Sequence, residues 1–470
     1  MIHTMELFNG FWLIQKVFPG RLVSLFLILH LGLIPLVSQS GEPLTRDQVL
    51  EQAQSNIEIY RKSDAVLRLV NSKGSPVMGA KVEIVQETQD FLFGAILFDL
   101  VWDRGMSAER ETLLKERFAG LFNLAILPFY WDSYESVPGH PRWDLIEPAL
   151  EWCLEQGITC KGHPLGWTHE VGIPDEVLDL SVEDAEMMLH ARIMENVIGF
   201  RNRITLWDVV NEPVNTVSWE MGHSDRSKEH RYRHDIPLEE LAGWVERAYK
   251  TAYRANPDNQ YILNEFKQIA DPEIRQRFYD FTQELLERGT PIQGLGLQAH
   301  EPRDEWYDPV DVWNTLELYA SFGLPLHITE FSPQSGGAPI TGGTREGTWT
   351  PETQAEFVEE MYRIWFGHPS VVSINWWGIS DANSWLPGAG FLDEELGSKP
   401  AYEVLKRLIK EEWMTPPLQQ ISEADGTIHF RGFHGKYLLV ATLADGSTRR
   451  LNFQLTSAVK GPNEVTLVID

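Results

Sequence analysis

Residues 204–213 read ITLWDVVNEP, an apolar run that ends in a carboxylate at Glu212. A second run, residues 325–331, reads PLHITEF and brings in Glu330 in the same way. Runs of β-branched and aromatic residues without polar alternation are typical of parallel strands that are buried on both faces. Each run therefore predicts a buried strand whose C-terminal end carries a glutamate.

Six further stretches have the same strand-like character, and amphipathic segments separate them. The strand candidates are residues 91–97, 124–128, 159–164, 260–265, 292–300 and 371–378. The helix candidates include residues 109–121, 184–199, 238–255, 272–288 and 351–367. Eight strand–helix units in roughly 320 residues predict a (β/α)8 TIM barrel of the α/β class over residues 91–413. An open doubly wound sheet is the alternative, but the sequence has no dinucleotide fingerprint.

The two flanks of this barrel are β in character and too short to hold a core alone. In the N-terminal flank, residues 41–90, we expect a helix at 46–61 and a β-hairpin formed by residues 65–70 and 80–85. The C-terminal flank, residues 414–470, contains strand-like runs at 427–433, 437–442 and 465–469. We predict that both flanks pack together as one small β-rich accessory unit.

Residues 1–40 have the layout of a signal peptide. Lys16 and Arg21 precede an apolar run that extends to Val37, and small residues follow it. A histidine and a proline interrupt the run, so its uninterrupted length is too short to span a bilayer. We expect cleavage near Ser40, a secreted, periplasmic or cell-surface location, and no stable membrane insertion after cleavage. A retained anchor is the alternative.

The charge composition restricts the kinds of ligand that the protein can bind. The 470 residues include 40 basic and 68 acidic side chains, which gives a net charge of −28. Such a surface repels nucleic acid and anionic membranes, so a neutral polymer or a small neutral ligand is the compatible partner. The 17 tryptophans offer flat rings on which sugars stack, although most tryptophans in any protein serve the core.

The sequence shows no pattern that calls for a metal or a cofactor. Cys153 and Cys160, the two cysteines, have neither zinc-site nor redox-pair spacing, and we expect them to be buried thiols. The 14 histidines form no metal-ligand cluster, and neither a phosphate-binding glycine loop nor a G-x-S-x-G elbow occurs. We therefore predict no metal and no cofactor.

Polar or aromatic side chains follow most of the predicted strands. In a barrel the carboxyl ends of the strands meet at one rim, which is where active sites form. Two carboxylates at such a rim are what glycoside hydrolysis requires. The candidate rim residues are His163, Asn211, Glu212, Asn264, Glu265, Gln298, His300, Glu330 and Trp377.

Five segments, in order along the barrel, resemble glycoside hydrolase family 10, the retaining endo-β-1,4-xylanases. They are residues 207–213, 294–300, 328–331, 377–386 and 392–402. The resemblance implies a secreted retaining β-glycoside hydrolase that cleaves xylan or a related hemicellulose by double displacement. It implies Glu212 as the general acid/base and Glu330 as the nucleophile.

The chemistry asks for the same two roles. Retention requires two carboxyl groups roughly 5–5.5 Å apart, one protonated and one ionised. The protonated group needs a raised pKa, which burial and a neighbouring charge provide. These requirements agree with the roles that the resemblance implies for Glu212 and Glu330.

The resemblance also implies roles around the pair. His300 would hold Glu330 by a hydrogen bond, and Asn211 would bind the 2-hydroxyl of the sugar. Asp208 would support the acid/base. The remaining substrate-binding candidates are His163, Trp167, Gln298, Trp377 and Trp385. A core histidine bonded to backbone is the alternative for His163, and core packing is the alternative for each tryptophan.

The chain departs from the family pattern on the side of the glycone. After the second strand the family has Glu-Asn-Glu-Met-Lys-Trp, whereas residues 126–132 read ILPFYWD. After the third strand, Trp167 is followed by Thr168 before the histidine. The substrate therefore stays open among xylan, decorated xylan, another β-linked hemicellulose and a shorter oligosaccharide. A non-catalytic carbohydrate-binding barrel and a β-glycanase of different specificity are the alternative functions.

Overall fold

The computed structural model describes residues 44–469, apart from residues 104, 170–171, 179, 216–236, 302 and 459–460. The predicted signal peptide lies outside the described residues. Within them, none of the helices combines the length and the apolar character that crossing a membrane requires.

Eight parallel strands of the described chain close into a barrel, which confirms the predicted fold class. The strand order is β5-β4-β3-β15-β11-β9-β8-β7, and pairing of β5 with β7 closes the ring. Nearly every residue in these strands is buried, as their continuous apolar runs predict. The strands are β3 (Leu92–Ile96), β4 (Leu124–Pro128), β5 (Thr159–His163), β7 (Leu206–Asn211), β8 (Gln260–Glu265), β9 (Gly294–Leu297), β11 (Leu326–Phe331) and β15 (Val371–Trp376).

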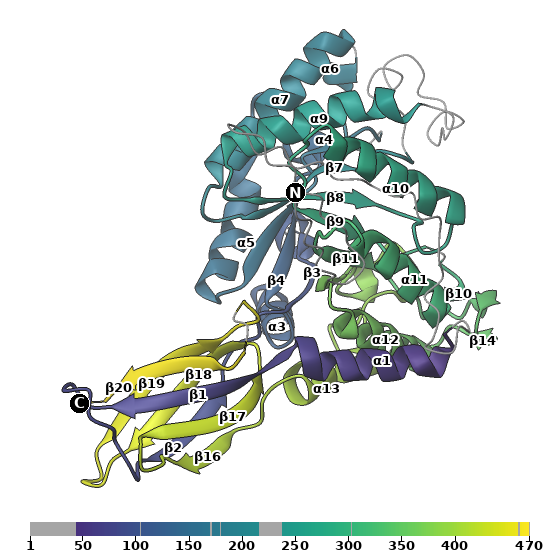
Figure 1. Cartoon of the computed structure of the whole chain (residues 1–470). Helices are drawn as coiled ribbons and strands as arrows, with labels where there is room; N and C mark the ends of the chain where they lie inside the picture. The colour runs from purple at the N-terminus through teal and green to yellow at the C-terminus, as the bar shows by residue number, and fades with distance from the viewer. Residues whose placement is uncertain are drawn as a thin grey trace, which may run out of the picture. The chain divides into compact units, whose positions relative to one another are not determined.

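One long helix follows each strand and covers the outside of the barrel (Figure 1). Several of these helices begin where the sequence supplies a cap: Ser181, Asp271, Asp308 and Thr350 each accept a hydrogen bond from a first-turn backbone N–H. The helices are α3 (Ala108–Ala119), α5 (Trp143–Glu155), α7 (Val182–Gly199), α9 (Leu238–Ala255), α10 (Pro272–Glu287), α11 (Pro309–Ala320), α12 (Pro351–Gly367) and α13 (Pro400–Arg407).

The two flanks of the chain form a β-sandwich. Figure 1 shows the purple strands of the N-terminal flank among the yellow-green strands of the C-terminal flank. One sheet has the order β17-β1-β20 and the other β16-β2-β18-β19. The strands are β1 (Lys62–Val70), β2 (Lys81–Gln86), β16 (Leu418–Ile421), β17 (Thr427–Phe433), β18 (Gly435–Thr442), β19 (Thr448–Leu455) and β20 (Asn463–Val468).

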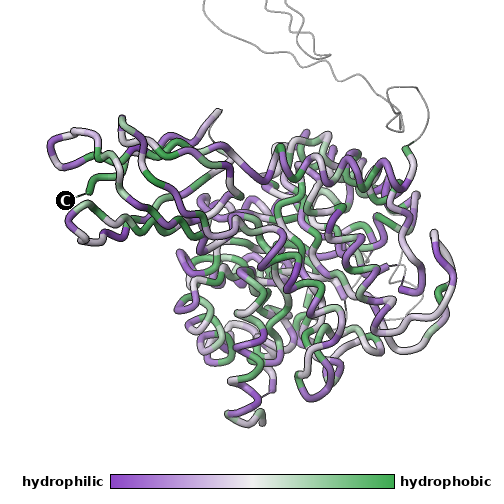
Figure 2. Tube along the Cα trace, turned by 90° about the horizontal axis from the view of Figure 1, so that it is seen from below, coloured by the Kyte–Doolittle hydropathy of each residue, from purple (hydrophilic) through white to green (hydrophobic). Residues whose placement is uncertain are grey.

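The predicted hairpin of residues 65–70 and 80–85 is wrong. β1 pairs with β17 and β20, and β2 pairs with β16 and β18, so the two strands lie in opposite sheets. Their alternating residues turn inward to a shared core that includes Leu67, Ile84 and Leu439. Figure 2 shows this alternation of hydrophobic and hydrophilic residues along the strands near the C-terminus. Alternation marks a half-buried strand, but it does not encode which strand becomes the partner.

Helix α1 (Arg46–Tyr60) packs along helix α12 of the barrel, and Figure 1 shows the two helices side by side. Arg61, directly after α1, donates hydrogen bonds of 2.7 Å to the carbonyl oxygens of Phe366, His368 and Val371. Its guanidinium also lies 4.7 Å from the ring centroid of Phe91. Burial lowers the pKa of Arg61 to about 9. The start of the sandwich is thereby bound to the barrel next to β15.

The two cysteines match their expected state. Cys153 lies in α5 and Cys160 in β5, and both are buried free thiols. They therefore serve the packing between that helix and strand.

Candidate active site

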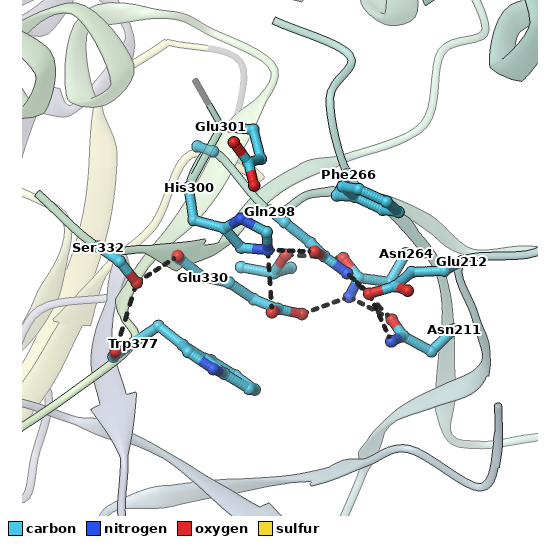
Figure 3. Close-up of polar contacts among 12 residues, drawn as sticks. Asn211, Glu212, Asn264, Phe266, Gln298, His300, Glu301, Glu330, Ser332 and Trp377 are labelled. Carbon is cyan, nitrogen blue, oxygen red and sulfur yellow. Dashed lines mark hydrogen bonds and ion pairs between the residues drawn. The ribbon is translucent and has the colours of Figure 1, made fainter. Parts of the chain in front are cut away.

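The two predicted catalytic glutamates meet at the carboxyl ends of the barrel strands. Glu212 directly follows β7, and Glu330 lies near the end of β11. Strands β8 and β9 stand between them in the sheet and place Asn264 and Gln298 at the same rim. Figure 3 shows the side chains of Glu212 and Glu330 approaching one another from opposite sides, with these two amides beside them.

Glu212 is held by hydrogen-bond donors on both carboxylate oxygens. The Oε1 atom accepts from Gln298 Nε2 at 3.0 Å and from Asn211 Nδ2 at 3.2 Å. The Oε2 atom accepts from the indole N–H of Trp167 at 2.9 Å. Three donors on one side chain fix the direction of its carboxyl group.

Glu330 accepts a hydrogen bond from Asn264 Nδ2 at 2.8 Å. The hydrogen bond expected from His300 is absent, because its Nε2 atom lies 3.8 Å from the nearest Glu330 oxygen. That nitrogen contacts Gln298 Oε1 instead, at 2.5 Å. Burial and then Arg303 lower the pKa of His300 to about 3, so the ring is neutral and forms no ion pair with Glu330.

Asn264 connects the two glutamates. Its amide nitrogen also donates to Asn211 Oδ1 at 2.9 Å, and its own oxygen accepts from Thr329 Oγ1 at 2.6 Å. Gly296 makes this placement possible, because a Cβ atom there would lie 2.3 Å from Asn264 Oδ1. The amide side chains therefore form one connected hydrogen-bond network beside the two glutamates. The orientation of each amide depends on the groups to which it is hydrogen-bonded.

Burial sets the charge state of the pair. It raises the pKa of Glu212 to about 7. Burial and then the charge of Glu212 raise the pKa of Glu330 well above its usual value, against the hydrogen bond from Asn264. Two carboxylates that repel one another in a buried site retain a proton between them near neutral pH. One protonated and one ionised carboxyl group are the requirement for retaining hydrolysis.

His163 belongs to a buried polar group that extends below the pair. Asp208 Oδ2 lies 2.7 Å from His163 Nδ1 and 2.7 Å from Lys161 Nζ. Asp208 thus bonds to His163 and Lys161, and the interpretation that it supports the acid/base stays a prediction. Burial would raise the pKa of Asp208, but Lys161 and the hydrogen bond from His163 outweigh it and lower that pKa. His163 is thus oriented by a carboxylate and not by backbone.

Aromatic rings form the opposite side of the site. Trp377 packs edge to face against His163 and Phe98, with centroids 5.0 and 5.4 Å apart. Tyr130 packs against Phe98 at 6.0 Å and His163 at 5.5 Å. Trp385 lies further out, with 43% of its surface exposed. Its ring meets His300 edge to face at 5.1 Å. Both predicted tryptophans therefore line the site and are not core residues.

Three residues of the site were missing from the predicted substrate and catalytic set. Asn264 is the next-to-last residue of β8, and its position near a strand end already marked it as a rim residue. Lys161 is a lone cation in a buried strand, which signals a buried partner. Tyr130 stands in the segment that departs from the family pattern. Within the described residues, no group of three or more histidine, cysteine, aspartate or glutamate side chains could hold a metal ion.

A closed (β/α)8 barrel with two glutamates at one rim, one half-buried and one buried, defines the class of barrel glycoside hydrolases. Residues 125–408, more than half of the chain, match the family model of glycosyl hydrolase family 10. The chain belongs to that family, and it is a glycoside hydrolase of the endo-1,4-β-xylanase type.

Similar proteins agree with this membership. Endo-1,4-beta-xylanase B of Thermotoga neapolitana is 28% identical over 291 residues, which cover 60% of this chain and 78% of that protein. The crystal structure of xylanase 10B from Thermotoga maritima superposes with a TM-score of 0.55 at 24% identity, over 69% of this chain and 96% of that one. Xylanase 10B from Thermotoga petrophila, solved with xylobiose, gives the same score and identity over 69% and 95%. The structural likeness at this identity shows the fold.

Proposed function

We propose that this protein is an exported retaining enzyme that hydrolyses β-1,4-linked xylan or a related hemicellulose, with Glu212 as acid/base and Glu330 as nucleophile. The observation that carries the proposal is the placement of two glutamates, Glu212 and Glu330, at the ends of β7 and β11 within one hydrogen-bonded network. The xylobiose complex of the Thermotoga petrophila relative supports a β-linked xylose polymer as the substrate.

In the first step, ionised Glu330 attacks the anomeric carbon while protonated Glu212 donates its proton to the glycosidic oxygen. The bond between that carbon and oxygen breaks, and the aglycone leaves as an alcohol. The glycone stays bound to Glu330 as an ester. The raised pKa of Glu212, about 7, keeps a proton available for this transfer in weakly acidic and neutral solution.

In the second step, Glu212 acts as a base. It takes a proton from water, whose oxygen attacks the anomeric carbon and displaces Glu330. The sugar leaves with its original configuration, and both glutamates return to their starting protonation states. Asn211 would bind the sugar 2-hydroxyl, while His163, Trp167, Gln298, His300, Trp377 and Trp385 would surround the sugar at the point of cleavage.

The variant Glu330→Gln tests the nucleophile. We expect its hydrolysis of an aryl β-xyloside to fall by about 10⁴-fold or more, because the amide cannot form the ester. Glu360→Gln is the matched control. Glu360 is a buried glutamate of α12 that accepts a hydrogen bond from the indole N–H of Trp306, and it lies outside the site. A folded Glu330→Gln protein that retains the wild-type rate, or a first-formed product of inverted configuration, would contradict the proposal.

Product analysis on a panel of polysaccharides tests the substrate. Unsubstituted xylan, arabinose- and glucuronate-decorated xylans, mixed-linkage glucan and short xylo-oligosaccharides separate the specificities that the altered segment 126–132 leaves open. A ladder of oligosaccharides from the start of the reaction indicates endo action. Release of one sugar at a time would contradict it.

Export rests on the basic and then apolar composition of residues 1–40. Expression of the whole chain in a host with an export pathway, followed by mass spectrometry of the active fraction, tests it. We expect an N-terminus near Ser40 in the exported fraction. Uncleaved protein in the membrane fraction would favour the retained anchor instead.

A further inference from the structure

A third glutamate, which is buried, stands beside the acid/base, and the proposed reaction does not use it. Glu265 is the last residue of β8, and its side chain is fully buried. Among the ion pairs of the described residues, none includes Glu265. A buried carboxyl group without a cation is costly unless hydrogen bonds hold it in place.

The hydrogen bonds of Glu265 go to the segment that follows the acid/base. Its Oε2 atom accepts from the backbone N–H of Val214 at 2.9 Å. Its Oε1 atom accepts from Asn215 Nδ2 at 2.9 Å, and from the N–H of Phe266 at 2.9 Å. Two of these three donors lie within three residues of Glu212 along the chain.

The backbone at Glu212 needs such support. Its φ angle is +56°, in the left-handed region that residues other than glycine seldom adopt. The N–H of Glu212 donates to the carbonyl oxygen of Asn264 at 2.9 Å. Strand β8 therefore holds this turn at two points: Asn264 fixes Glu212 itself, and Glu265 fixes the two residues at 214 and 215.

The charges of the two glutamates also act on one another. Burial, and then the charge of Glu212, raise the pKa of Glu265 to about 8. Tyr319 faces Glu265 from α11, and its pKa is raised by burial and in part by that glutamate. Lys267, two residues beyond Glu265, lowers the pKa of Glu212. A change at Glu265 therefore reaches the proton affinity of the acid/base as well as its direction.

We infer that Glu265 is a positioning residue for the acid/base: it anchors the turn at residues 213–215 and so sets the direction in which Glu212 presents its proton. The inference rests on the proposed function, because it presumes that Glu212 protonates the leaving group. It assigns a role to a residue that does not touch the sugar.

The test compares two leaving groups. A phenyl β-xyloside needs a proton from Glu212 to leave, whereas a 2,4-dinitrophenyl β-xyloside leaves without one. In Glu265→Gln the amide turns an N–H toward a backbone N–H and loses one hydrogen bond. We expect kcat/KM, which reports the first step, to fall about tenfold or more for the phenyl glycoside. For the dinitrophenyl glycoside we expect a change of less than about threefold, and the alkaline limb of the phenyl profile should shift.

The variant Glu265→Asp provides a second measurement if Glu265→Gln fails to fold. It keeps the carboxylate and shortens its reach, and we expect the same preference for the activated leaving group. Glu360→Gln is the control for loss of a buried carboxylate, and its two rates should stay in the wild-type ratio.

Equal losses on both glycosides, or no loss in a folded Glu265 variant, overturn the inference and leave the proposed function intact. A wild-type protein that is inactive on both glycosides removes the proposed function, and the inference with it.

Discussion

The two sides of the candidate site are built in different ways. On the side of β7, β8 and β9, the amides of Asn211, Asn264 and Gln298 donate hydrogen bonds of 2.8 to 3.2 Å to the two glutamates. On the side of β3, β4 and β15, the rings of Tyr130 and Trp377 each contact Phe98 and His163, with centroids 5.0 to 6.0 Å apart. Hydrogen bonds fix direction, whereas ring contacts fix shape. We call the side with the three amides the amide side and the side with the three aromatic rings the ring side. We infer that the amide side sets the rate of the chemical step and that the ring side determines which sugar fits.

The two sides also differ in their effect on stability. Burial raises the pKa of both glutamates, which means that the folded protein disfavours their ionised forms. Burying an aromatic side chain instead stabilises the fold by about 1.5–3 kcal/mol. The amide side is thus the part of the site where function and stability conflict. Three substitutions distinguish the two sides, and they are given in order of expected effect.

Asn264→Asp should produce the largest change. The donor that lies 2.8 Å from Glu330 becomes an oxygen, so Glu330 loses its hydrogen bond and gains a repelling neighbour. Loss of one preorganised donor lowers kcat by about 10²–10³-fold. We expect a fall of that size on an aryl β-xyloside at saturating substrate.

The control is Asn256→Asp. Asn256 is equally buried and precedes β8 at its other end, where its amide donates to Asn259 at 2.8 Å. This variant should lose stability but keep kcat within about threefold of the wild-type value. A similar kcat for both variants would remove the distinction between the two sides.

Glu212→Gln should change the pH dependence of stability. The folded-state pKa of about 7 lies above the ordinary value of 4.5, so the folded protein keeps a proton that the unfolded chain releases. Below pH 4.5 both states hold the proton and the residue has no effect. As pH rises through 7, the wild type loses about 3 kcal/mol of unfolding free energy relative to the variant.

Urea unfolding at pH 4.5 and pH 8 measures this difference. Hydrogen bonds lost in the variant lower its unfolding free energy by the same amount at both pH values. They therefore do not alter the difference between the two pH values. The release of Glu330 from its charged neighbour acts in the same direction. Glu51→Gln, at an exposed position of α1, is the control for replacing a glutamate outside the site. If the difference in unfolding free energy between the wild type and Glu212→Gln is the same at both pH values, burial does not raise the pKa of Glu212.

The features predicted from the sequence are those that depend on strand ends and periodicity. Eight apolar runs identified the eight barrel strands, and Glu212 and Glu330 lie at the ends of two of them because parallel strands bring their carboxyl ends together. The wrong predictions concern partners. They are the pairing of residues 65–70 and the hydrogen bond of His300, which depend on neighbours that are distant in sequence.

These errors share a physical cause. The partners of Asp208 show this dependence: Asp208 lies in β7, which Glu212 directly follows, but a register irregularity falls between Asp208 and Asn211. Its partners, Lys161 and His163, come from β5, which closes the ring against β7. The sequence pattern locates a residue along a strand. The side chain that it meets depends on the register and tilt of the barrel.

Tyr130→Phe should have the smallest effect, and it tests the ring side. Burial, and then the charges of Glu330, Glu212 and Asp208, raise the pKa of Tyr130 well above its usual value, so its hydroxyl stays a donor at working pH. Among the described residues that hydroxyl has no hydrogen-bond partner, which leaves it free to donate to a sugar. Loss of one such hydrogen bond lowers kcat/KM by about five- to tenfold.

The measurement that tests the ring side is whether the fall in kcat/KM comes from a higher KM or from a lower kcat. If the ring side selects the sugar, KM rises and kcat changes by less than about twofold, because the interaction is present in the ground state and the transition state alike. Tyr134→Phe is the control, since Tyr134 lies in the short helix α4 (Trp131–Tyr134), which Tyr130 directly precedes, and its hydroxyl is buried. A loss confined to kcat would instead place Tyr130 with the amides, as a group that acts on the charge developing at Glu330.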